Sequence, residues 1–177
     1  VIDVATQKAM KVNKTALNTI TGGYQWYDDN TLLYRTILKP AAAAPPKPAV
    51  PTGPTIQENY GKASPRPTFQ DLIKSPYDET LYAFYATTQL VKNSNGMETK
   101  IGQPAIYSMI SISPDKKYML LRTLKKPFSY TVPAGGFPSI VAITDMNGKV
   151  VKELADLPSA ETAPAGYDNV QLVPRAF

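Results

Sequence analysis

The residues that could supply a nucleophile and its base are few in this chain. Ser113 and Lys116 have the S-x-x-K spacing that some penicillin-binding enzymes use for a nucleophilic serine and a lysine. That chemistry needs the serine at the start of a helix, whereas Pro114 and Asp115 predict a turn between two strands. The chain has no histidine and no cysteine, which excludes a Ser-His-Asp triad, a thiol nucleophile and a thiolate zinc site. A G-x-S-x-G nucleophile elbow is also absent, so we expect no catalytic residue here.

Two pairs of neighbouring carboxylates are the candidates for acid–base catalysis or metal binding. Asp28-Asp29 stands directly before Asn30 and predicts a turn. Asp78-Glu79 fits the first turn of a helix, where acidic side chains complement the helix dipole. The sequence also lacks the glycine-rich loops that bind phosphates. We therefore expect neither a metal ion nor a cofactor.

The most notable polar group is basic. Arg122, Lys125 and Lys126 stand at the start of a loop, residues 124–138, that is rich in proline, glycine and aromatic residues. One interpretation is a solvated, charged loop tip. The other is a substrate-binding group that attracts an acidic peptide through charge-assisted hydrogen bonds. Both stay open on the sequence alone.

Charge and hydropathy limit the other partners. The chain carries 19 Lys and Arg against 14 Asp and Glu, with a pI near 9.3, but these cations are scattered along it. Nucleic-acid binding normally needs a clustered basic stripe, so we expect no nucleic-acid partner. No apolar run reaches the roughly 20 residues of a membrane helix, so we expect no membrane partner either.

The elements that position these residues are hairpins of two alternating kinds. The first kind is a strand that carries a turn residue and a basic step. In two copies the turn is an Asn-Gly step, at Asn95-Gly96 and Asn147-Gly148, which predicts a tight turn with positive φ at both positions. The second kind ends on Arg-Thr, at Arg35-Thr36 and Arg122-Thr123. The segments of the first kind are 1–12, 86–101 and 140–154, and those of the second are 24–36 and 111–123.

This alternation predicts an all-β chain, a partial β-propeller with two to three four-stranded antiparallel blades. Residues 1–37 would end one blade and start the next, and 86–177 would form further blades, truncated at the C-terminus. Between them we expect a Pro/Ala-rich insertion loop, 38–67, and a short helical segment, 68–85, of two turns broken at Ser75-Pro76, with Ser75 or Asp78 as the cap. Two or three blades cannot close a ring, so we expect more of the propeller before the strand that begins at Val1 and after Phe177.

Several segments, taken in order, resemble the prolyl oligopeptidase family, in its glutamyl-endopeptidase-like branch. They are SPYDETLYAFYATTQLV (75–91), KIGQPAIYSMISISPDKKYMLL (100–121), KKPFSYTVPAGGFP (125–138), DMNGKVVKELADLPSAE (145–161) and the final PRAF (174–177). The resemblance implies a periplasmic or secreted serine peptidase in which a propeller lies over an α/β-hydrolase domain. It also implies that this chain is the non-catalytic part, which gates access and helps to bind peptide substrates.

The implied partners are that hydrolase domain and the peptide substrates. The resemblance makes Arg122, Lys125 and Lys126 a substrate-binding group, by their position in a propeller loop. An alternative is a free-standing module that binds peptides or proteins and forms homo-oligomers through blade edges.

Overall fold

Nine strands and one α-helix form within residues 1–38, 43–49 and 69–162, which the computed structural model describes. The first strands are β1 (Ile2–Asp3), β2 (Lys8–Ala9), β3 (Tyr24–Asp28) and β4 (Thr31–Ile37), and α1 (Pro76–Ala86) follows them. The others are β5 (Thr88–Ser94), β6 (Met97–Ile112), β7 (Tyr118–Leu124), β8 (Ser139–Asp145) and β9 (Val150–Leu157). Two short 3₁₀ turns, η1 (Ala134–Gly136) and η2 (Ala160–Thr162), flank the last two strands.

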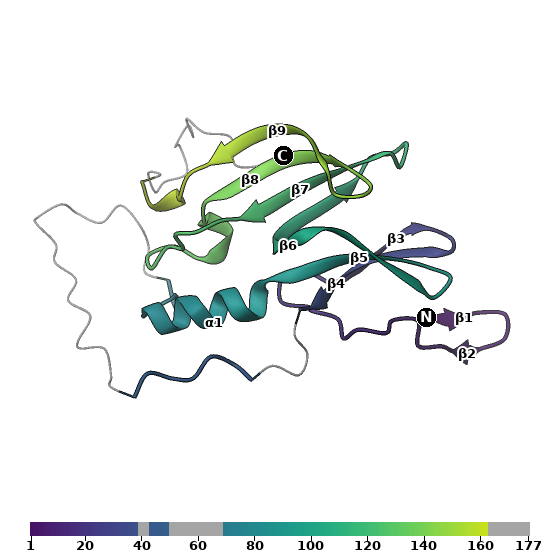
Figure 1. Ribbon diagram of the computed structural model, residues 1–177, viewed down its shortest axis with the longest axis horizontal. Coiled ribbons are helices and arrows are strands. Elements are labelled where there is room, and N and C mark those ends of the chain that lie inside the picture. Colours follow the sequence, from purple (N-terminus) through teal and green to yellow (C-terminus); the bar gives the residue numbers. More distant parts are fainter. Residues whose placement is uncertain (39–42, 50–68, 163–177) are drawn as a thin grey trace, which may run out of the picture.

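Seven of the strands, β3 to β9, form one antiparallel sheet in the order of the sequence, and the sheet curls into a half-barrel (Figure 1). β1 and β2 form a separate small hairpin. The prediction of a mostly β chain with little helix is confirmed. Separate propeller blades are not confirmed, because β6 joins all seven strands into a single sheet.

β6 has 16 residues and serves two neighbours in turn. Its pairing with β5 extends to Ala105, and its pairing with β7 begins at Ile106. The register shifts near Gly102, which has a φ of +58° that residues with side chains rarely adopt. We call β3, β4, β5 and β6 up to Ala105 the first half, and β6 from Ile106 with β7, β8 and β9 the second half.

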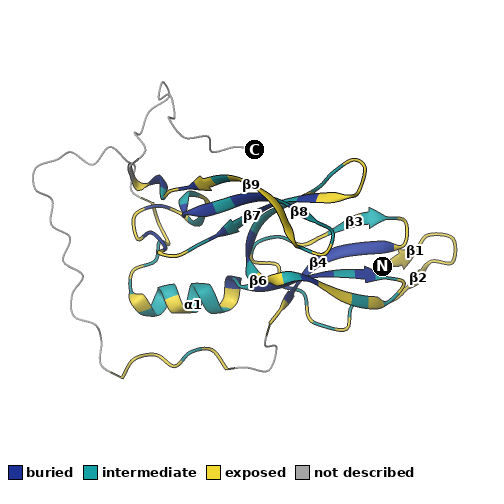
Figure 2. Ribbon diagram, turned by 45° about the horizontal axis from the view of Figure 1, so that its top comes forward, coloured by how far each residue is buried: buried dark blue, intermediate teal, exposed yellow. Residues whose placement is uncertain are grey.

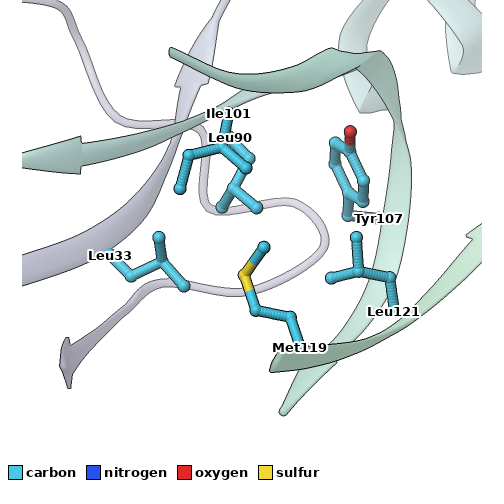
Figure 3. Close-up of a cluster of buried hydrophobic side chains, with 6 residues drawn as sticks. All are labelled: Leu33, Leu90, Ile101, Tyr107, Met119 and Leu121. Carbon is cyan, nitrogen blue, oxygen red and sulfur yellow. The ribbon is translucent and has the colours of Figure 1, made fainter. Parts of the chain in front are cut away.

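The two halves face each other across a shared core (Figure 3). Leu33 and Leu90 come from the first half, and Met119 and Leu121 come from the second. Strand residues alternate between the two faces of a sheet, so each half contributes one face to this core. Ile101 and Tyr107 fill the core on either side of the bend in β6. Figure 2 shows that burial concentrates in these strands, whereas the β1–β2 hairpin is exposed.

The chain before β3 covers the outer face of the first half. Val12 and Leu17 pack against Leu32, Tyr34 and Val91. A polar network fixes the same segment. Asn93 donates hydrogen bonds to the Val12 carbonyl (2.8 Å) and to the Tyr34 hydroxyl (2.9 Å), and that hydroxyl donates to Glu98 Oε1 (2.8 Å).

The two Asn-Gly hairpins exist as predicted, but they turn differently. Asn95 (φ 51°) and Gly96 (φ 83°) both have positive φ, as the prediction requires. In the second hairpin only Gly148 does (φ 84°), so the prediction for Asn147 is wrong. The reason is Asp145, whose Oδ1 accepts hydrogen bonds from the backbone N–H groups of Asn147 and Lys149 (2.9 Å each) and stabilises a longer turn.

α1 is a single helix of 11 residues, so the expected pair of helical turns around Ser75-Pro76 is wrong. Ser75 is the N-cap, and its hydroxyl accepts a hydrogen bond from the Asp78 backbone N–H (3.1 Å). Asp78 reaches back and accepts one from the Lys74 N–H (3.1 Å), so both predicted capping residues act at one helix start. The residues before Ser75 are not helical, and Asp71 has a φ of +57° there.

Other expectations fall partly or wholly outside the described residues. They are the greater part of the 38–67 insertion, the end of the 86–177 segment and the final PRAF. In the described piece of the insertion, the Pro45 carbonyl accepts a hydrogen bond from the Tyr77 hydroxyl of α1 (3.1 Å). No helix within the described ranges is long and apolar enough to cross a membrane.

Candidate functional site

The predicted basic group lies where β7 runs into the loop before β8. This loop folds back on α1 through aromatic side chains. Phe128 and Phe137 stack on each other with ring centroids 5.2 Å apart, and Tyr82 of α1 meets both rings edge-on. Phe128 and Phe137 are buried together with Val132 and Leu124. The loop is therefore a packed part of the structure, and it holds its charged residues in defined positions.

Arg122 lies within β7, and its side chain forms hydrogen bonds with the β7–β8 loop and the first residue of β8. Its Nε donates to the Ser139 hydroxyl (2.9 Å), and an Nη donates to the Gly135 carbonyl (3.1 Å). Both acceptors are neutral, and no carboxylate among the described residues forms an ion pair with Arg122. The guanidinium nevertheless uses these hydrogen bonds to join η1 to the start of β8.

The two lysines have acidic partners from different elements. Lys125 forms an ion pair with Asp156 of β9. Lys126 lies 3.3 Å from Glu79 of α1 and 5.6 Å from the centre of the Phe128 ring. The three cations are thus neighbours in sequence, but their charged groups contact different partners. Their role in binding an acidic peptide stays a prediction.

The other residues considered for chemistry act in turns and caps. The Ser113 hydroxyl donates to Asp115 Oδ1 (2.6 Å) and accepts from the Tyr118 N–H (3.0 Å), which closes the β6–β7 turn. Asp28 accepts from the Asn30 N–H (2.9 Å) within the β3–β4 turn. This backbone hydrogen bond holds the pKa of Asp28 below its ordinary value. The structural interpretation of the S-x-x-K match and of Asp28-Asp29 therefore agrees with the geometry.

A groove of about 580 Å³ lies between the β1–β2 hairpin and the tips of the first half. Its wall includes the exposed ring of Trp26. The charged side chains in the wall, Lys11, Lys14 and Asp29, are interspersed with asparagines. No group of three His, Cys, Asp or Glu that could hold a metal exists among the residues the structure describes. The groove therefore offers contact surface with both apolar and polar side chains.

Sequence reasoning missed one polar residue, Arg35 of β4. It is 8% exposed, and its Nε has no hydrogen-bond partner among the described residues. Beside it lies a cavity of about 60 Å³, which is also lined by Gln25 and Ile110. The repeated Arg-Thr step pointed to Arg35 only as a strand end. Its burial depends on the packing of β6 against β3 and β4, which the hairpin pattern does not contain.

Comparison with known proteins gives two significant relatives. The probable glutamyl endopeptidase, chloroplastic, of Oryza sativa subsp. japonica is 40% identical over 176 residues, which are 97% of this chain and 19% of the rice protein. The protein of the same name from Arabidopsis thaliana is 40% identical over 157 residues, 88% of this chain and 16% of its own length. No protein-family model and no solved structure gives a significant match. The chain is therefore homologous to one segment of proteins named as probable glutamyl endopeptidases, and it spans less than a fifth of their length.

Proposed function

We propose that this chain is the non-catalytic segment of a serine peptidase of the prolyl oligopeptidase type. In this proposal it forms neighbouring blades of a β-propeller that gates the access of peptides to an α/β-hydrolase domain and helps to bind them. The observation that carries the proposal is the homology to a small part of two much longer proteins with a peptidase name. The absence of histidine agrees with it, because the triad would have to lie elsewhere in the protein.

The way the two halves stack supports the propeller. The sequences YQWYDDNTLLYRT and SISPDKKYMLLRT are equivalent hairpins, so Arg35 corresponds to Arg122. Arg35 pairs with Leu90 and shares its face with Leu33, which lies in the common core. Leu121 also lies in that core, so its neighbour Arg122 is on the opposite face of the second half.

Equivalent faces of the two halves therefore point in the same direction. The first half packs its arginine face against the other face of the second half. A stack of this kind can be continued by a third unit in the same manner, which is how blades repeat around a propeller axis. If the two halves instead packed equivalent faces against each other, a third unit could not be added in the same manner.

The proposal is tested on the intact protein that contains this chain. We expect an active-site fluorophosphonate probe to label it at a serine outside residues 1–177, while the isolated chain is neither labelled nor active on peptides. We also expect short peptides to be cleaved much faster than a folded protein with the same cleavage sites. A reading frame without a hydrolase domain, or labelling within the chain, would disprove the proposal.

The basic group has its own test within the proposed enzyme. Lys125→Glu with Lys126→Glu should raise KM for peptides with acidic side chains at least about tenfold, because two attractive charges become repulsive. Lys149→Glu, at the exposed turn between β8 and β9, is the matched control for a change of charge alone. An equal effect on acidic and neutral peptides would remove the substrate-binding role and leave the peptidase proposal intact.

A second candidate function is a free-standing binding module that self-associates through its sheet edge. The observation in its favour is β9, an edge strand on which Val150 and Val151 are 58% and 57% exposed. Such an edge can pair with another strand. Sedimentation analysis distinguishes the two: Val151→Lys should dissociate an edge-paired dimer and leave a peptidase segment unaffected.

The compartment is a further part of the proposal. We propose a periplasmic or secreted location, whereas both relatives carry chloroplastic in their names. Cell fractionation with an antibody against this chain tests it, and recovery of the protein in the cytoplasmic fraction would contradict it.

A further inference from the structure

Arg35 is a charged residue in an unusual environment for this chain. Its side chain points from β4 towards the shared core, on the same face as Leu33, and is 8% exposed. No acidic group within the described ranges lies within ion-pair distance of it. Burial lowers the pKa of Arg35 from its ordinary value, but an arginine remains charged at neutral pH. A buried charge without a partner of opposite charge destabilises the folded protein.

A second unsatisfied donor lies beside it. Gln25 of β3 pairs with Leu33 of β4, so its side chain is on the face that also carries Arg35, two residues further along β4. Its Nε2 is buried and has no hydrogen-bond partner in the described part of the chain. Both Gln25 and Arg35 line the cavity of about 60 Å³, together with Ile110 of β6. Two residues with an unpaired donor therefore line the same small space.

The guanidinium of Arg35 lies against a glycine, Gly22, whose missing side chain leaves space for it. A Cβ atom on Gly22 would lie 2.3 Å from Arg35 Nη1, and Gly22 has a φ of +143°. A residue with a side chain would displace the guanidinium from its present position. The position of Arg35 therefore depends on a glycine two residues before the start of β3.

We propose that Arg35 and Gln25 form a binding site for one carboxylate group. A carboxylate accepts hydrogen bonds and carries the missing negative charge, and arginine binds this group with two parallel N–H donors. A cavity of about 60 Å³ has room for the two oxygens of a carboxylate. The carboxylate belongs to an acidic ligand, which the experiment supplies as a small molecule. This inference does not rest on the proposed peptidase function.

The test titrates the full chain with N-acetyl-L-glutamate and follows the Arg35 Nε–H resonance by NMR and the midpoint of thermal unfolding. N-acetyl-L-glutamine is the neutral matched ligand, and sodium chloride controls for ionic strength. We expect saturable movement of the resonance with glutamate alone, and a midpoint raised by about 4 °C at ten times the dissociation constant. Gln25→Met should weaken binding about tenfold, because it removes one hydrogen bond to a charged group.

Two arginine variants decide the outcome. Arg35→Met should abolish the ligand-dependent rise, whereas Arg122→Met lowers the midpoint and keeps the rise. The proposal is overturned if glutamate moves neither the resonance nor the midpoint of the wild-type chain. It is also overturned if Arg35→Met keeps the full ligand effect.

Discussion

The two halves of the sheet are built from similar hairpins, but the hairpin tips and the equivalent arginines of the two halves have different contacts. In the first half the tip of the β5–β6 hairpin is open, and nothing would contact a Cβ atom on Gly96 within 4 Å. In the second half the tip of the β8–β9 hairpin packs on the bend of β6. A Cβ atom on Gly148 would lie 2.5 Å from both the N and Cα atoms of Gly102.

The arginines of the repeated hairpins differ in the same way. Arg122 donates its hydrogen bonds to a loop of its own half, at Ser139 and Gly135. Arg35 faces the other half and has no partner there for its Nε. Equivalent residues of a repeat thus have different partners, because the arginine face of the first half lies inside the stack and that of the second half lies at its end. A sequence repeat predicts that its copies have the same backbone structure. It does not predict that equivalent side chains have the same neighbours.

The largest effect expected from this comparison is at the two hairpin glycines. Gly148→Ala should lower the free energy of unfolding by about 3 kcal/mol, since it combines an unfavourable φ with overpacking against backbone atoms. Gly96→Ala has the same φ but open space, and should cost about 1 kcal/mol. Urea denaturation of both variants measures the difference. Equal losses would show that the β8–β9 tip does not pack on β6.

A smaller effect is expected from Glu98, which binds the chain before β3 to the first half. Burial alone would raise the pKa of Glu98, but hydrogen bonds from the Lys14 N–H (2.6 Å) and the Tyr34 hydroxyl outweigh it and hold the pKa below 4.5. The stabilisation by the ionised Glu98 is therefore complete above the ordinary pKa of a glutamate. It is lost as the pH falls through the lowered pKa that Glu98 has in the folded protein. Glu98→Gln should lower stability by about 1 kcal/mol at pH 7 and flatten this acid dependence.

The same hydrogen-bond network also makes the stability fall at alkaline pH, and this loss provides a control for the Glu98 experiment. Burial, opposed by the Asn93 hydrogen bond and reinforced by Glu98, raises the pKa of Tyr34 to about 12. The stabilisation from the neutral phenol is present below pH 10 and is lost as the pH rises towards 12. Tyr34→Phe should remove this alkaline loss. Unfolding curves from pH 3 to 11 test both residues, and an unchanged acid slope in Glu98→Gln would contradict the assignment.

The smallest effect is expected at the exposed ion pair of the second half. Lys125→Met removes the pair with Asp156, and such solvated pairs contribute only about 0.5 kcal/mol. The loss should disappear in 0.5 M salt, because screening weakens exposed pairs. Thermal denaturation at two salt concentrations measures it. A loss above 2 kcal/mol would mean that Lys125 helps to fold the loop and is not available for a ligand.

The sequence by itself determined where the hairpins of this protein lie. Alternating apolar residues and turn residues identified the hairpins, and the missing histidine excluded a triad, because these properties depend on neighbouring residues or on composition. Only the tertiary structure decided that β6 runs through both halves and that Gly148 lies on Gly102. It also separated Arg122, Lys125 and Lys126 onto different partners and placed Arg35 beside a cavity. These outcomes depend on contacts between residues far apart in the chain, which a local pattern does not record.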